Sequence, residues 1–232
     1  MLRMLVVQSV GLPVMGLHET GWDVQVCQED AATVLRLLRQ PFAAVVLPGT
    51  DSFACLPAQY RLQRQSIPGT LLQRPGPVFA AVLPAPDPCR RELLEQVGFD
   101  PVLAQPVSAV AAAQRLYDAV GAAMEQCRRK ECDLRAQVRE LLHREGCPTH
   151  LKGFAYLCEC LIYLAGEPDA LYQATKVLYP QVAAQMETSA TNLERSMRTA
   201  LARMQGGTRL CITAFLSQMQ QQMEQCQRSF RV

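Results

Sequence analysis

The 232-residue sequence predicts two domains, an α/β domain with a parallel sheet and a following all-helical domain that contains a helix-turn-helix. Two observations lead to this prediction. Over residues 1–118, short apolar runs alternate with helical stretches, which is the pattern of buried parallel strands connected by helices. Over residues 141–232, apolar residues recur at intervals of three and four, as they do on one side of a helix.

Five apolar runs in the first domain are predicted to be strands: MLVVQ at 4–8, WDVQVC at 22–27, FAAVVL at 42–47, VFAAVL at 78–83 and PVLA at 101–104. Helices are predicted at 30–40 and 88–98, and a third helix is predicted to begin near 107. The segment 50–76, which is rich in Gln, Pro and Gly, is predicted to be irregular. Five strands alternating with helices over about 120 residues predict a doubly wound, flavodoxin-like fold.

This half resembles the receiver domain of bacterial response regulators in its length, its strand pattern and the Gln105-Pro106 pair, where receivers have Lys-Pro. The resemblance implies an acidic pair that holds Mg²⁺, an aspartate that accepts the phosphoryl group, and a lysine. In this sequence the corresponding positions are occupied by Gln8, Ser9, Leu47 and Gln105. Asp51 lies four residues past the acceptor position and is a poor substitute. We therefore expect a receiver-like scaffold that binds no metal and is not phosphorylated.

Residues 119–140 are charged and proline-free, which predicts a helical linker. Apolar residues around this segment keep a heptad-like spacing, at Leu116, Val120, Met124, Cys127, Leu134, Val138 and Leu141. Two interpretations fit this spacing. The helix forms a dimer seam, or its apolar residues pack on the two flanking domains. Gly146 and Pro148 are predicted to end the helix.

The stretch TSATNLERSMRTALARM at 188–204 is predicted to be an amphipathic helix. Its apolar side is formed by Leu193, Met197, Ala200, Leu201 and Met204, and its polar side by Glu194, Arg195, Arg198 and Thr199. Thr188 and Ser189 stand where a hydroxyl can cap the first turn. A short helix at 179–186 precedes it closely, as in a helix-turn-helix that reads DNA. The alternative is an ordinary helix whose charges face water.

Three sequence motifs in this half decide in favour of a DNA-reading helix over an ordinary solvated one. They are GCPTHLKGFAYL at 146–157, TKVLYP at 175–180 and LERSMR at 193–198. Over roughly 134–205 the chain closely resembles the C-terminal DNA-binding domain of the sporulation master response regulator family, stage zero sporulation protein A. The resemblance implies a bundle of about six helices that binds DNA.

Carried over position by position, the resemblance implies that Glu194, Arg195 and Arg198 read bases. Arginine is suited to guanine, and glutamate accepts a hydrogen bond from cytosine. Contacts to the DNA backbone are expected from Thr188, Ser189, Asn192 and Thr199. Asn192 and Thr199 depart from the family's Arg and His, and residues 184–185 replace its Lys-Lys pair. Fewer cationic contacts are expected to lower phosphate-driven affinity.

Composition narrows the function further. The net charge is +2, with about +3 in residues 134–232 and about −1 in residues 1–133, which is compatible with DNA binding by the C-terminal half. Ten cysteines include no CxxC pair, and the three histidines are not at zinc spacing, so we expect reduced thiols and no metal. Without a signal segment or a nucleophile–base pair, the sequence predicts a cytoplasmic protein that is not an enzyme and needs no cofactor.

The sequence thus predicts a DNA-binding transcription regulator of the two-component type, related to sporulation initiation. Double-stranded DNA is the expected partner, a homodimer and a contact with RNA polymerase are further expectations, and no membrane is involved. The alternative is a non-catalytic interaction module, or an antagonist that heterodimerises with a paralogous regulator. The lost lysines and lost receiver chemistry favour this alternative, whereas Glu194, Arg195 and Arg198 favour direct DNA reading.

Overall fold

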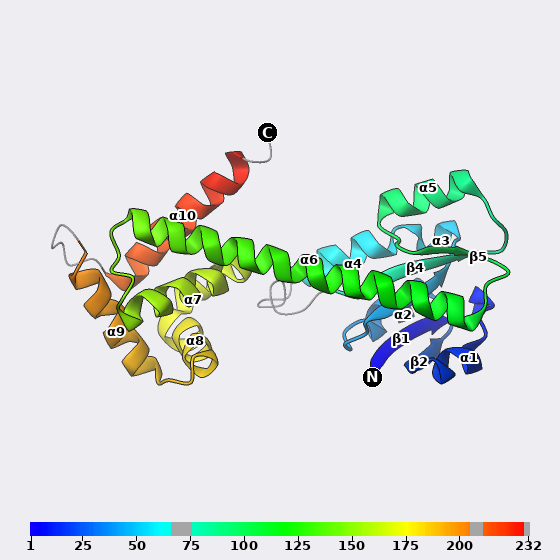
Figure 1. Cartoon of the computed structure of the whole chain (residues 1–232), viewed down its shortest axis with the longest axis horizontal. Helices are drawn as coiled ribbons and strands as arrows, with labels where there is room; N and C mark the ends of the chain where they lie inside the picture. Colours follow the sequence, from blue (N-terminus) through cyan, green and yellow to red (C-terminus); the bar gives the residue numbers. More distant parts are fainter. Residues whose placement is uncertain (66–75, 205–210, 230–232) are drawn as a thin grey trace. The chain divides into compact units, whose positions relative to one another are not determined.

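The computed structural model describes residues 1–65, 76–204 and 211–229 (Figure 1). The chain divides into two compact units, the first extending to Cys127 and the second beginning at Arg128. Helix α6 (Ala109–Arg144) contributes to both units. No helix in the described part of the chain is both long and apolar enough to cross a membrane.

The first unit is built on five parallel strands: β1 (Leu2–Val7), β2 (Trp22–Cys27), β3 (Ala44–Pro48), β4 (Val78–Leu83) and β5 (Val102–Ala104). Their order is β2-β1-β3-β4-β5, which is the flavodoxin-like order shared by receivers. Val6 pairs with Val26 on one side and Val46 on the other, so the β-branched residues are aligned across the centre of the sheet. The predicted fold class of this unit is confirmed.

The helices of the first unit begin where local chemistry favours a start. They are α1 (Val14–Glu19), α2 (Ala31–Leu37), α3 (Asp51–Ala54), α4 (Leu56–Gln65), α5 (Pro88–Val97) and the first part of α6. Asp30 caps α2 by accepting a 2.8 Å hydrogen bond from the Thr33 amide, and Asp87 caps α5. Gly98 ends α5 with φ at 105°, a conformation that favours glycine.

The prediction that residues 50–76 are irregular is wrong for 51–65, which form α3 and α4. Phe53 and Leu56 are 1% exposed and belong to the core of the sheet. Burial of these two side chains outweighs the Gln- and Pro-rich composition of the segment. Pro57 is compatible with a helix because it lies in the first turn of α4, where its missing amide costs nothing. Residues 66–75 lie outside the described part.

The second unit is entirely helical over its described residues. After α6 come α7 (Lys152–Gly166), a 3₁₀ turn (Pro168–Gln173), a π turn (Ala174–Leu178), α8 (Tyr179–Gln185), α9 (Ala190–Ala202) and α10 (Ile212–Ser229). The predicted all-helical class is confirmed. Its core includes Leu157, Leu161 and Leu164 of α7, each fully buried. Helix α6 ends as predicted, with Gly146 in the left-handed conformation at φ 77°.

Five of the seven heptad-like residues of α6 fill cores within the chain, whereas Met124 is 54% exposed and Cys127 is only partly buried. Leu116 and Val120 belong to the core of the first unit, whereas Leu134, Val138 and Leu141 belong to that of the second. Leu134 and Val138 are 8% and 0% exposed, so they do not form an accessible apolar seam. This burial favours the interpretation of the helix as a linker whose apolar residues pack on the flanking domains.

Candidate nucleic-acid interface

Helices α8 and α9 are joined by a tight turn whose backbone hydrogen bonds are satisfied locally. The Thr188 amide donates to the Ala183 carbonyl at 2.9 Å, which closes the end of α8 in a Schellman arrangement. Glu187 occupies the left-handed position of that turn, with φ at 50°. Two consecutive helices with this short connection have the form of a helix-turn-helix.

The start of α9 is fixed by the two hydroxyl residues that the sequence singled out. Ser189 is the N-cap, and its hydroxyl accepts a 3.2 Å hydrogen bond from the Asn192 amide. Asn192 Nδ2 donates to the Thr188 hydroxyl at 3.0 Å. Thr188, Ser189 and Asn192 therefore form one connected polar group at the N-terminus of α9, where the helix dipole favours an anion.

The apolar side of α9 is packed against α7. Leu193, Met197 and Ala200 are fully buried, and the Met197 sulfur lies 3.8 Å from Cys160 Sγ on α7. Gly153 of α7 faces the backbone of α9 so closely that a Cβ at this position would collide with the Ser196 carbonyl. The glycine in the word LKGFAYL therefore has a packing role, because only a residue without a side chain allows the two helices to approach so closely.

The opposite side of α9 carries the residues predicted to read bases. Arg195 and Arg198 are exposed and lie three residues apart, so both project from the same side. Glu194 is half-buried, and its Oε1 forms an ion pair with Arg198 Nη2, one helical turn away, at 2.5 Å. The Thr199 hydroxyl donates to the Arg195 carbonyl at 2.9 Å. The structure thus brings Glu194 and Arg198 together and leaves Arg195 without a carboxylate partner among the described residues.

Tyr179, the first residue of α8, is a buried residue beside α9 that the sequence patterns do not single out. It is 4% exposed, and burial raises the pKa of its phenol to about 12, with the Glu194 carboxylate adding to the shift. Arg198 acts in the opposite direction. The sequence feature that could have indicated this buried tyrosine is the Tyr-Pro pair that ends the motif TKVLYP.

The four residues that replace the receiver's phosphorylation site lie at the C-terminal edge of the sheet, and none of them is acidic. Gln8 and Ser9 directly follow β1 and are exposed, whereas Leu47 in β3 is fully buried. Gln105 follows β5, and its amide donates to the Val10 carbonyl at 2.8 Å. The Gln105 side chain therefore contacts the backbone of the β1–α1 connection.

Asp51, which begins α3 just after β3, is engaged by an arginine. Arg90 Nη2 lies 2.6 Å from Asp51 Oδ1, and Arg90 Nε donates to the Gly49 carbonyl at 3.1 Å. Across the described residues, no three His, Cys, Asp or Glu side chains gather in a set that could hold a metal ion.

Residues 138–230 match the family described as "Sporulation initiation factor Spo0A C terminal". The C-terminal part of this chain is a Spo0A C-terminal domain. This agrees with the resemblance drawn from the three sequence words. The chain therefore joins a receiver-like α/β domain to a Spo0A C-terminal domain.

Solved structures of response regulators are similar to this chain at low identity. A CheY-like receiver domain protein from Methanospirillum hungatei JF-1 has 14% identity and a TM-score of 0.42, covering 54% of this chain and 98% of its own. Full-length FixJ from B. japonicum has 15% identity and a TM-score of 0.36, with 95% of this chain and 97% of its own covered. The receiver-like assignment itself rests on the strand order of the sheet.

Proposed function

We propose that this chain is a sequence-specific DNA-binding transcription regulator in which α9 is the recognition helix. The observation that carries the proposal is the two-sided structure of α9 within a Spo0A C-terminal domain. One side of the helix is buried against α7, whereas Arg195 and Arg198 are exposed and project together. A helix supported in this way can enter the major groove with its polar side without disturbing the core.

Each polar residue has a distinct role in this proposal. Arg195 and Arg198 donate to guanine, and Glu194 orients Arg198 through their ion pair or accepts from cytosine. Thr188, Ser189, Asn192 and Thr199 contact the DNA backbone. Thr188, Ser189 and Asn192 already form a polar group at the N-terminus of α9, where backbone amides and the helix dipole favour a phosphate.

The deciding experiment is a competition assay in which the full chain selects from randomised DNA duplexes. Arg195→Ala is expected to cost about 1–3 kcal/mol at the best site and to relax the preference at one base pair. Ser189→Ala is expected to weaken binding to all sequences alike, because a phosphate contact carries no sequence information. A uniform loss from both variants would remove the base-reading role.

We further propose that the receiver-like domain does not take up a phosphoryl group. Leu47 is buried at the acceptor position, the acidic pair is replaced by Gln8 and Ser9, and Asp51 is bound by Arg90. Incubation with acetyl phosphate and Mg²⁺ is expected to leave the intact mass unchanged. An adduct on the N-terminal unit that is stable enough to locate would contradict this proposal.

A second candidate function is an interaction module or antagonist that pairs with a related regulator. It is favoured by the Glu194–Arg198 ion pair, which occupies one of the two arginines, and by exposed Ala184 and Gln185 in place of a lysine pair. Sequence-selective DNA binding by the full chain would reject this candidate. Salt-sensitive binding without selectivity would favour it.

A further inference from the structure

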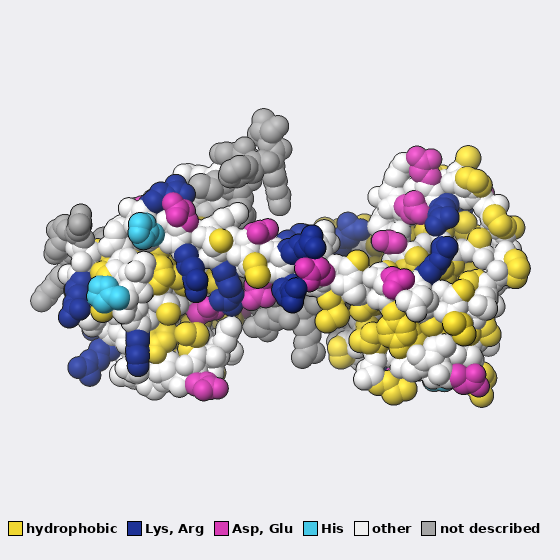
Figure 2. Space-filling view, viewed as in Figure 1, with side chains coloured by type: hydrophobic (Ala, Val, Ile, Leu, Met, Phe, Trp, Pro, Cys, Tyr) yellow, Lys and Arg dark blue, Asp and Glu magenta, His cyan; other side chains and the backbone are white. Residues whose placement is uncertain are grey.

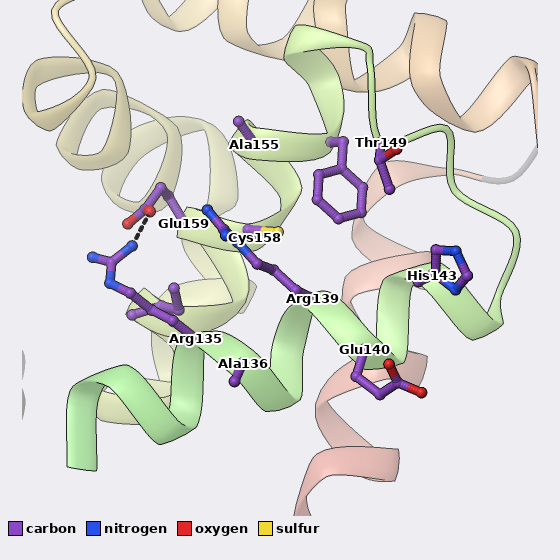
Figure 3. Close-up of a pocket in the computed structure, with 11 residues that line it drawn as sticks. Arg135, Ala136, Arg139, Glu140, His143, Thr149, Ala155, Cys158 and Glu159 are labelled. Carbon is purple, nitrogen blue, oxygen red and sulfur yellow. Dashed lines mark hydrogen bonds and ion pairs between the residues drawn. The ribbon is translucent and has the colours of Figure 1, made fainter. Parts of the chain in front are cut away.

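A groove with a volume of about 550 Å³ opens between α6 and α7, within the second unit (Figure 3). Its floor is apolar, because α7 contributes Phe154, Cys158 and Ile162, which are 9%, 5% and 7% exposed. Burial raises the pKa of the Cys158 thiol to about 12, so this part of the floor is uncharged at neutral pH. From α6 the groove receives Arg135, Arg139 and His143. These residues recur every four positions and therefore follow one side of the helix.

The carboxylates of the groove are already paired. Glu159 forms an ion pair with Arg135, and Glu140 forms one with Arg144 at 3.3 Å. Arg139 extends from α6 across the groove toward Cys158, whereas Glu140 points away from it (Figure 3). Within the part of the chain that the structure describes, Arg139 has no carboxylate partner. The groove therefore combines an apolar floor with an uncompensated guanidinium, and it is complementary to a ligand that carries both apolar groups and a carboxylate.

This groove lies on the side of α7 that faces away from the recognition helix. Gly153 and Cys160 are seven residues apart, about two turns, and both contact α9. Ile162 of the groove is nine residues from Gly153, about two and a half turns, and therefore lies on the opposite side of α7. Because the exposed side of α9 points away from α7, DNA bound to α9 leaves the groove accessible. The basic side chains of the groove are thus not in a position to serve the same DNA contact.

We propose that this groove is a docking site for an acidic amphipathic helix of a partner protein. Apolar side chains of that helix would cover Phe154, Cys158 and Ile162, and a carboxylate would pair with Arg139. An arginine beside an apolar floor is suited to this role, because the bound helix would partly exclude water from the ion pair between Arg139 and its carboxylate. The position of the groove allows the partner to bind while α9 contacts DNA. Figure 2 shows dark blue basic side chains along this part of the molecule, beside exposed apolar ones.

The proposal is tested with a phage-displayed library of randomised helical peptides, selected against the full chain. Enriched peptides are expected to carry Glu or Asp beside apolar residues at helical spacing. Arg139→Glu is expected to weaken their binding at least tenfold, and Ala136→Trp, which fills the groove from an exposed position, is expected to do the same. Lys130→Glu is the matched control, because it makes the same charge change nine residues away, on the opposite side of α6.

Each outcome decides for or against the groove. Enrichment of acidic peptides that lose binding with Arg139→Glu but not with Lys130→Glu supports the docking site. Enrichment of basic or neutral peptides, equal effects of the two charge reversals, or no enrichment overturns it. DNA binding by the same variants is measured separately. If Arg139→Glu lowers DNA affinity more than Lys130→Glu does, the groove is part of the DNA interface and the proposal is wrong, whereas the proposed role of α9 is unaffected.

Discussion

The exposed side of α9 and the C-terminal edge of the sheet differ in the residues they carry. The first has charged side chains exposed to solvent, whereas the second has a buried leucine. At α9, the buried residues Leu193 and Met197 hold the helix, and charged side chains are free to project from its other side. At the sheet edge, Leu47 stands at the position that the receiver resemblance assigns to the acceptor, and it is part of the core. The scaffold is intact in both places. The buried residues carry the fold in both places, whereas the proposed DNA contact depends on particular side chains at the surface.

The strongest attempt to reverse this difference is to restore a carboxylate at the sheet edge. Leu47→Asp places a charge where the side chain is fully buried. We expect a loss of roughly 3–5 kcal/mol in the free energy of unfolding of the first unit, measured by urea titration. Cys55→Asp, at an exposed position eight residues on, is the control and should have little effect. A stable Leu47→Asp protein that takes up phosphate would show that the site is only dormant.

The packing that presents α9 can be weakened at one position. Gly153→Ala adds a Cβ that collides with the Ser196 carbonyl, so α7 and α9 must separate. A destabilisation of about 1–3 kcal/mol is expected, with a parallel loss of DNA affinity. Gly121→Ala is the matched control, since nothing lies within 4 Å of its Cβ position in α6, and it should stabilise by about 0.5–1 kcal/mol. Thermal unfolding of the two variants measures the contrast.

The charged pair on α9 offers a subtler test. Glu194→Gln removes the carboxylate that holds Arg198 and leaves the arginine free to meet phosphate. We expect affinity for random DNA to rise several-fold and the preference for the best site to fall, as measured by fluorescence anisotropy at two salt concentrations. Glu140→Gln, which removes a carboxylate paired with Arg144 on α6, should leave both quantities unchanged. Equal changes in the two variants would mean that the pair on α9 has no special role.

The smallest effect is expected at the C-terminal end of β5. Gln105→Ala removes the hydrogen bond to the Val10 carbonyl and should destabilise the first unit by about 1 kcal/mol. DNA affinity should be unaffected, as expected if the sheet edge takes up no phosphoryl group. Gln114→Ala removes an exposed hydrogen bond to Asp118 and serves as the control in the same denaturant titration. A change in DNA affinity with Gln105→Ala would reveal communication between the units.

The sequence by itself determined where the five strands lie along the chain, the helical second domain and the two sides of α9, because apolar runs and helical spacings depend only on local chain geometry. It also identified the Spo0A C-terminal domain from three short words. Tertiary structure decided what local patterns leave open. The segment 51–65 became helical because Phe53 and Leu56 are buried against the sheet, and Leu134 and Val138 turned out to fill a core within the chain. The approach of Gly153 to Ser196 and the groove beside Arg139 both depend on where separate helices meet. Such contacts join residues that are distant in sequence, so no local pattern predicts them.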